Sequence, residues 1–150
     1  MEAYSTLDLK GHIWQTIHRG SMPELTDQDI SWERYYKSYI RTYINRDIKD
    51  RIKVSNVTTF NKFMISMASR TGELFNAASI ASDVGVSLKT AQEWASMLEG
   101  SGIIRFVYPF ERNIAKRAIK TPKLYFMDTG LVCGLVGWTN ATVADRKSTR

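Results

Sequence analysis

The chain has 150 residues, of which 43% are hydrophobic and 24% charged, and these values are ordinary for one compact globular domain with or without appendages. The formal net charge of +6 suits an acidic partner such as nucleic acid, although it does not require one. The one cysteine, Cys133, excludes an internal disulfide and a cysteine metal cluster, and the sequence shows neither a membrane-spanning apolar run nor a signal peptide, so we expect a cytoplasmic protein without a membrane partner.

The first expected element is a helix over residues 7–18. Ser5 and Asp8 have the spacing of a capping box, and Gly20 with Pro23 interrupts the chain after the helix. The expected inner stripe consists of Ile13, Trp14 and Ile17.

The longest expected helix covers residues 32–53 and is amphipathic. Its apolar face consists of Tyr36, Ile40, Tyr43, Ile44, Ile48 and Ile52. The basic residues of the other face are interpreted as a solvated surface. A further helix over 57–69 carries apolar residues at intervals of three and four, which we interpret as core packing and not as a cofactor site: Val57, Phe60, Phe63, Met64 and Met67.

The most informative stretch is residues 76–109, which predicts two helices joined by a tight turn. Asn76 is placed to cap a short helix over 77–84, Gly85 permits the turn, and Ser87 is placed to cap the second helix. The second helix has its apolar residues at helical spacing, and Gly100 and Gly102 mark its end. This pattern is typical of a helix-turn-helix.

Two strands are expected after the second helix, over residues 103–110 and 123–127, and another helix begins at Asp128 or Thr129. The predicted fold is therefore mainly α: a winged helix-turn-helix with a β-hairpin wing, preceded by a long amphipathic helix. The buried core should include Phe60, Phe63, Ile80, Val84, Trp94, Leu98 and Ile103.

The residues assemble no catalytic constellation, so we expect no enzyme, no cofactor and no metal site. The chain lacks a phosphate-binding GxxxxGK[ST] loop and a GxSxG nucleophile motif. His12 and His18 are six residues apart, which is the wrong spacing for two metal ligands on one helix face. Cys133, in a Gly-rich apolar run, is interpreted as a small buried residue.

Two groups of residues are candidates for nucleic-acid contact. The start of the second helix offers side chains for base edges and phosphates: Ser87, Lys89, Thr90 and Gln92. The loop between the strands offers four cations: Arg112, Lys116, Arg117 and Lys120. Because Glu93 and Glu99 make the second helix slightly acidic, the loop should supply most of the attraction to DNA, which would be weak and largely independent of sequence.

Three segments together resemble a family of prokaryotic AAA-type ATPases whose C-terminal region is domain of unknown function 4143: YIRTYINRDIKD, RTGELFNAASIASDVGVSLKTAQEWASMLEGSGIIRFVYPF and KTPKLYFMDTGLVCGLVG. RGSMPEL at residues 19–25 is similar to the segment that follows the ATPase core in that family. The resemblance implies four parts: residues 1–28 as the tail of an ATPase domain, 29–55 as a linking helix, 56–127 as the winged helix, and 128–150 as the truncated start of a nuclease-like domain.

The resemblance also implies that the chain lacks the family's phosphate loop and nuclease residues, so neither activity is expected of it. The expected function is that of a non-catalytic module, a fragment of such an ATPase, which binds nucleic acid or couples the ATPase to a partner. The alternative left open is a protein-interaction or oligomerisation module without DNA binding, whose partner is an ATPase domain or a second copy of the chain.

Overall fold

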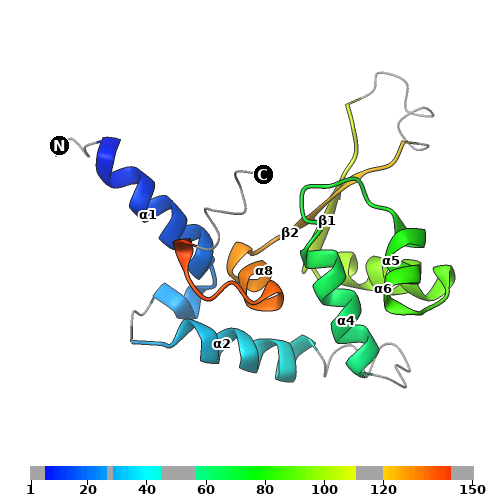
Figure 1. Ribbon diagram of the computed structural model, residues 1–150, viewed down its shortest axis with the longest axis horizontal. Coiled ribbons are helices and arrows are strands. Elements are labelled where there is room, and N and C mark those ends of the chain that lie inside the picture. Colours follow the sequence, from blue (N-terminus) through cyan, green and yellow to red (C-terminus); the bar gives the residue numbers. More distant parts are fainter. Residues whose placement is uncertain (1–5, 27–28, 45–56, 111–119, 143–150) are drawn as a thin grey trace. The chain divides into compact units, whose positions relative to one another are not determined.

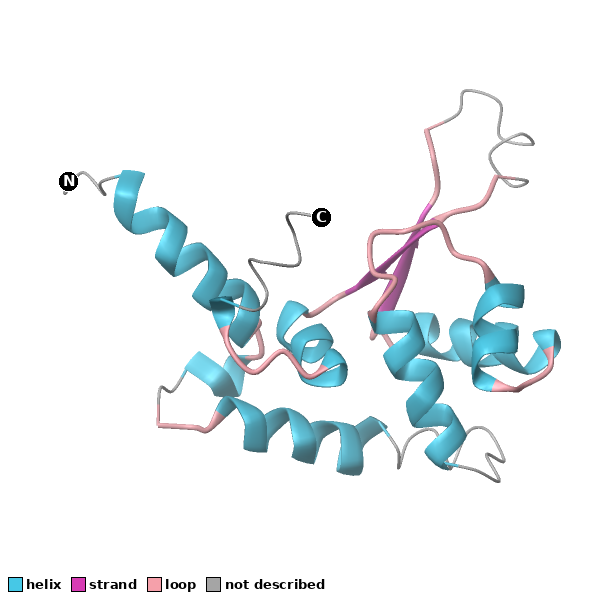
Figure 2. Ribbon diagram, in the orientation of Figure 1, coloured by secondary structure: helices cyan, strands magenta, loops and turns pink. Residues whose placement is uncertain are grey.

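A computed structural model describes residues 6–26, 29–44, 57–110 and 120–142, with backbone alone for 6–12, 26, 43 and 44. The described chain is mainly helical and contains one two-stranded antiparallel sheet, which confirms the prediction of a mainly α protein (Figures 1 and 2). It divides into two compact units. Unit 1 combines Met1–Lys53 with Asp128–Arg150, and unit 2 is Val54–Met127.

Unit 1 is built from short helices that come from both ends of the chain. Helix α1 (Thr6–Arg19) and helix α2 (Trp32–Tyr39) both pack against helix α8 (Thr129–Val136). A 3-10 turn, η1, covers Pro23–Thr26 between the first two helices. The packing of α8 against elements more than 90 residues earlier in the chain closes the unit.

Two expectations for unit 1 need correction. The long helix ends its α-helical part at Tyr39 and continues as a π-helical turn, η2 (Ile40–Ile44), while the rest of the expected helix lies outside the described residues. Ile13 is 49% exposed, so it does not belong to an inner stripe, and Trp14 and Ile17 are half-buried. The first helix itself is confirmed.

Unit 2 places three helices around the base of a β-ribbon (Figure 1). Its elements are helices α4 (Val57–Ala68), α5 (Ala77–Val84) and α6 (Leu88–Gly100) and strands β1 (Ile104–Val107) and β2 (Lys123–Phe126). The strands pair antiparallel, with Ile104 opposite Phe126. The first strand is shorter than predicted and stops at Val107, and Leu74, between α4 and α5, bridges to Lys123 on the other side of β2.

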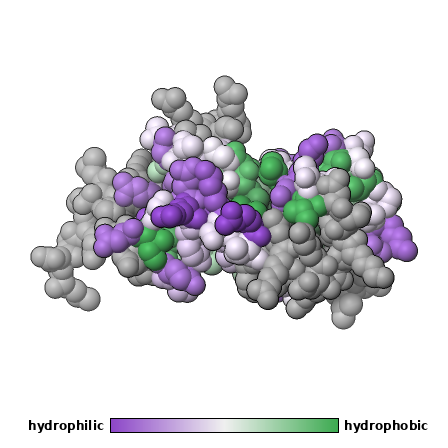
Figure 3. Space-filling model, turned by 90° about the horizontal axis from the view of Figure 1, so that it is seen from below, coloured by the Kyte–Doolittle hydropathy of each residue, from purple (hydrophilic) through white to green (hydrophobic). Residues whose placement is uncertain are grey.

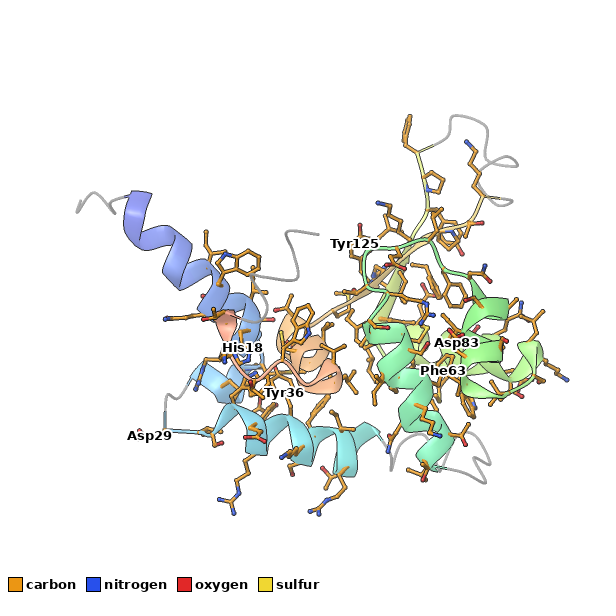
Figure 4. All side chains as sticks on the ribbon, viewed as in Figure 1. His18, Asp29, Tyr36, Phe63, Asp83 and Tyr125 are labelled. Carbon is orange, nitrogen blue, oxygen red and sulfur yellow. The ribbon has the colours of Figure 1, made fainter. Side chains whose placement is uncertain are left out.

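The core of unit 2 is an aromatic cluster between α4 and α6. Trp94 meets Phe60 and Phe63 edge-on, with ring centroids 5.1 and 5.3 Å apart. Such pairs contribute about 0.5–1.5 kcal/mol beyond the burial of their area. Phe63 points from α4 into the helices of this unit (Figure 4). The predicted core residues are buried, except Val84, which is half-buried because it ends α5 beside the turn at Gly85.

Several large apolar side chains remain at the surface instead of joining this core. They include Leu74, Leu88, Val107 and Met127. In the view of Figure 3, small hydrophobic groups stand beside hydrophilic ones. Exposed apolar side chains that gather in one patch, as opposed to single ones, often mark an interaction surface.

Candidate nucleic-acid interface

The turn between α5 and α6 is fixed by three local contacts that the sequence predicted. The Asn76 side chain accepts a hydrogen bond from the Ser79 backbone N–H (3.0 Å) and thus begins α5. Gly85 ends α5 with φ of 77°, a left-handed conformation that other residues rarely adopt. Ser87 Oγ accepts from the Thr90 N–H (3.0 Å) and begins α6. These three contacts fix the orientation of α6 and thus the side on which its first turn is exposed to solvent.

The residues predicted at the start of α6 do not all have free side chains. Ser87 Oγ also lies 2.8 Å from Thr90 Oγ1, so both hydroxyls take part in capping the helix. Lys89 Nζ is 3.9 Å from Glu93 Oε1, and both side chains are exposed. Glu93 therefore offsets part of the positive charge of Lys89, as the acidic count of this helix suggested.

A groove of about 660 Å³ joins the start of α6 to the segment that leads into β2. Its lining includes the cap Asn76 and Ala78 of α5, Leu88 and Gln92 of α6, and Lys120 with Pro122 before β2. The groove thus brings together Gln92 and Lys120, two predicted contact residues that are 28 positions apart in the sequence. Lys89 and Ser87 do not line it.

The remaining loop residues of the prediction, Arg112, Lys116 and Arg117, lie outside the described residues. Lys120 is described and exposed. Two carboxylates of unit 2 have partners of their own: Asp83 pairs with Arg70 (2.5 Å), and Glu99 Oε1 accepts from the Phe106 N–H (3.2 Å). Glu99 is consequently directed at the strand.

Unit 1 contains a buried polar cluster that was not predicted from the sequence. Asp128 is 6% exposed and accepts hydrogen bonds from the Tyr36 hydroxyl (2.6 Å), the Ser21 N–H (2.7 Å) and the Leu131 N–H (2.6 Å). Burial and the bond to Asp128 raise the pKa of Tyr36 well above its usual range, so its hydroxyl stays a donor. With its oxygens occupied in this way, Asp128 acts as a structural anchor.

Two glycines leave the space that this cluster needs. A Cβ at Gly20, whose φ is 80°, would overlap the Tyr36 hydroxyl and lie 2.7 Å from Asp128 Oδ2. A Cβ at Gly130 would overlap the same hydroxyl and lie 2.5 Å from the Arg19 carbonyl oxygen. The sequence signal was the Asp-Thr-Gly triplet at 128–130, in which a helix-capping residue precedes a glycine inside the first turn.

A second cavity, of about 460 Å³, lies within unit 1 beside this cluster. His18 and Trp32 line it as a stacked pair with ring centroids 4.2 Å apart, and His18 Nε2 is 2.8 Å from the Trp138 carbonyl oxygen. Figure 4 labels His18 and Tyr36 in this unit. The contacts hold the His18 ring in place as a packing residue.

Neither metal nor thiol chemistry finds support in the part of the chain that the structure describes. No three metal-binding side chains gather among these residues. Cys133 is buried, and burial raises the pKa of its thiol to about 11, so the reactive thiolate is scarce near neutral pH. None of the described helices is both long and apolar enough to cross a bilayer.

The described chain is a mainly helical protein with one small antiparallel sheet, and its family follows from comparison with known proteins. Residues 10–142 match the family described as domain of unknown function DUF8612, and the chain belongs to this family. Two uncharacterized proteins, Mb2031c of Mycobacterium bovis and Rv2008c of Mycobacterium tuberculosis, are each 30% identical to it over 133 residues. The alignment covers 85% of this chain but 30% of each relative. No solved structure matches.

The family match corrects the resemblance drawn from the sequence. That resemblance was to AAA-type ATPases with domain of unknown function 4143, whereas the match is to a different domain of unknown function. The sequence segments that suggested it contain capped helices, a glycine turn and short apolar strands, and such elements recur in unrelated folds. The interpretation of residues 1–28 and 128–150 as parts of ATPase and nuclease-like domains loses its support with it.

Proposed function

We propose that residues 56–127 form a winged helix-turn-helix that binds nucleic acid and catalyses no reaction on it. The order of elements in unit 2 supports this: helix, bridging segment at Leu74, helix, glycine turn, helix and two antiparallel strands. This order is typical of winged-helix proteins, which use the helix after the turn for recognition. Because winged helices also bind proteins, the fold alone does not decide the function.

The groove lined by Gln92 and Lys120 carries the proposal. An amide on the recognition helix can pair with adenine edges, and a lysine at the rim can contact a phosphate. The two side chains come from separate segments, so a nucleic-acid strand in this groove would contact helix and loop together.

The charges of the site favour weak binding with little sequence preference. Lys89 is offset by Glu93, so α6 adds little net attraction. The segment between β1 and β2 carries Arg112, Lys116, Arg117 and Lys120 against Glu111 in its sequence. Attraction that comes mainly from such basic residues acts on phosphates and so does not discriminate between sequences.

Fluorescence anisotropy with labelled DNA duplexes tests the assignment of the binding residues. Arg112→Gln, Lys116→Gln, Arg117→Gln and Lys120→Gln should each weaken binding on every duplex alike. Lys62→Gln, which removes an exposed charge from α4, is the matched control and should have a smaller effect. Equal losses for Lys62→Gln and the loop variants would show that overall charge, and not this site, attracts DNA.

The alternative function is a protein-interaction module that does not bind DNA. Leu88 favours this alternative because it is 47% exposed and lines the groove. An aliphatic side chain makes no favourable contact with phosphates. In that case no duplex binds even at low salt, and the groove serves a protein partner or a second copy of the chain. Sedimentation of the chain at several concentrations then distinguishes a self-association from a separate partner.

A further inference from the structure

The solvent side of the β-ribbon carries a surface that shares only Leu74 with the groove. Side chains alternate along the two strands, so Leu124 and Phe126 are buried while Lys123 and Tyr125 are exposed. Across the sheet, Arg105 lies opposite Tyr125 and Val107 lies opposite Lys123. We call this surface the ribbon face; it consists of Leu74, Arg105, Val107, Lys123, Tyr125 and Met127.

The apolar members of the ribbon face are unusually exposed. Leu74, Val107 and Met127 are 61%, 49% and 55% exposed. Leu74 bridges to Lys123, and Val107 pairs with Lys123 from the other strand, so Leu74 and Val107 flank one lysine. Cross-strand neighbours lie within about 5.5 Å, so these three residues make a joined patch instead of scattered single residues. Met127 follows Tyr125 by two positions and so lies on the same face.

Tyr125 contributes an aromatic surface to the same face. A Cβ at Gly72 would lie 4.0 Å from Tyr125 Cε1, so the ring passes beside a backbone that has no side chain. Figure 4 labels Tyr125 on the ribbon. The ring is 39% exposed, and its hydroxyl and the Arg105 guanidinium both offer hydrogen-bond donors at the surface.

The charge of the ribbon face is positive. Within the described chain, neither Arg105 nor Lys123 forms an ion pair. Glu73 is exposed in the bend that precedes Leu74, and the two cations of the ribbon face outnumber this one carboxylate. The Glu99 carboxylate is engaged by the Phe106 N–H at the outer edge of β1. That contact partly covers the edge of β1. A partner can therefore bind to the face of the ribbon more easily than it can pair with β1 as an added strand.

We propose that the ribbon face docks a protein segment that carries both carboxylates and apolar side chains. The carboxylates would pair with Arg105 and Lys123, and the apolar side chains would cover Leu74, Val107 and Met127. A nucleic-acid strand fits this face less well. Aliphatic side chains make no favourable contact with phosphates. The one exposed aromatic ring provides a stacking position for a single base. The proposal is independent of the nucleic-acid groove, since the two sets of residues share only Leu74.

Selection from a randomised peptide display library against the full chain tests this proposal. We expect the enriched peptides to combine Asp or Glu with apolar residues. The double variant Arg105→Glu/Lys123→Glu should weaken their binding about tenfold or more, since like charges then face each other. Val107→Ser should also weaken it, whereas Lys62→Glu, the matched charge reversal on α4, should not. The Trp94 signal in ¹⁹F NMR of the chain labelled with 5-fluorotryptophan verifies that unit 2 of each variant is folded.

A charge exchange makes the test specific. Peptides whose acids are replaced by lysine should bind the Arg105→Glu/Lys123→Glu variant better than the original chain does. Glu99→Ala, which removes the acceptor of the Phe106 N–H and so frees the edge of β1, should leave peptide binding unchanged. The proposal is overturned if no acidic and apolar peptide is enriched or if the ribbon-face variants bind unchanged. It is equally overturned if Glu99→Ala alone alters binding, or if the double variant impairs binding of an oligothymidine more than that of the peptides.

Discussion

The two units of this chain are stabilised in different ways. Unit 2 has an apolar core in which Trp94 packs edge-on against Phe60 and Phe63. Unit 1 has a buried polar centre in which Asp128 binds the hydroxyl of Tyr36 and the backbone of Ser21. An apolar core tolerates exchange of similar side chains, whereas a buried carboxylate becomes costly as soon as one donor is lost. We therefore expect the stability of unit 1 to fall when a substitution adds or removes a single atom at the polar centre. The stability of unit 2 should depend instead on the volume of the buried side chains.

The tryptophans allow the two units to be followed separately. Trp94 is the one tryptophan in unit 2, and Trp14, Trp32 and Trp138 belong to unit 1. In a chain labelled with 5-fluorotryptophan, ¹⁹F NMR therefore reports the unfolding of each unit. The predictions below use this separation where the variant permits it.

The largest effect is expected for Trp94→Ala. Removing this buried ring should lower the free energy of unfolding of unit 2 by about 3–5 kcal/mol, because the cavity adds to the lost burial. Urea denaturation followed by circular dichroism measures the loss, and the three remaining ¹⁹F signals show whether unit 1 persists. A loss below about 1 kcal/mol would contradict the aromatic core.

Gly130→Ala should be the most damaging small change in unit 1. The added methyl group meets the Tyr36 hydroxyl and the Arg19 backbone, so one of them must move, at a cost of about 3 kcal/mol. Gly100→Ala is the matched control, because a Cβ there meets nothing within 4 Å and alanine favours a helix. If both variants unfold at the same urea concentration, the close packing around Tyr36 is wrong.

Tyr36→Phe removes a single oxygen from the polar cluster. Asp128 keeps its backbone donors, so we expect a loss of about 1–2 kcal/mol in unit 1 and an unchanged unfolding midpoint for Trp94. Cys133 should also react faster with a thiol reagent as unit 1 opens more often. Tyr108→Phe, at an exposed position, is the control; an equal effect of the two changes would refute the role of the Tyr36–Asp128 bond.

Alkaline pH should weaken unit 1 by a smaller and graded amount. The folded chain raises the pKa of Cys133 to about 11, from 9.0, and raises that of Tyr36 as well, so the folded state holds these protons more tightly than the unfolded state. The stability they contribute is complete below about pH 9 and is lost as the pH rises above it. The unfolding midpoints of the unit 1 signals should shift to lower urea concentration between about pH 9 and pH 11, and Tyr36→Phe should reduce that shift. A shift toward higher urea would contradict the sign.

The comparison also explains what the sequence could and could not predict. Helix spacing and caps at Asn76, Gly85 and Ser87 are local, so the turn between α5 and α6 was predictable, as was the burial of Trp94. The Tyr36–Asp128 contact joins residues 92 positions apart and depends on two glycines whose role is to leave space. Periodicity contains no information on such a contact.

The candidate site was predictable only in part, for the same reason. Gln92 and Lys120 were predicted as separate contact residues, but the groove that joins them depends on how the approach to β2 packs beside α5. Composition also does not show how the side chains at the start of α6 pair. The Ser87 and Thr90 hydroxyls lie within hydrogen-bond distance of each other, and Lys89 pairs with Glu93, because of the local geometry of the helix. The ribbon face needed the strand register, which places Arg105 opposite Tyr125.

The central functional claim is that unit 2 attracts nucleic acid through phosphate contacts of the basic residues between β1 and β2. A salt titration by fluorescence anisotropy on several duplexes of different sequence tests it most directly. With three to four phosphates neutralised, the logarithm of the binding constant should fall with the logarithm of salt concentration at a slope of about −3 to −4, similar for every duplex. Each loop charge removed should reduce the slope by about one. A shallow slope with a strong preference for one duplex, or no binding to any duplex at low salt, would contradict the claim.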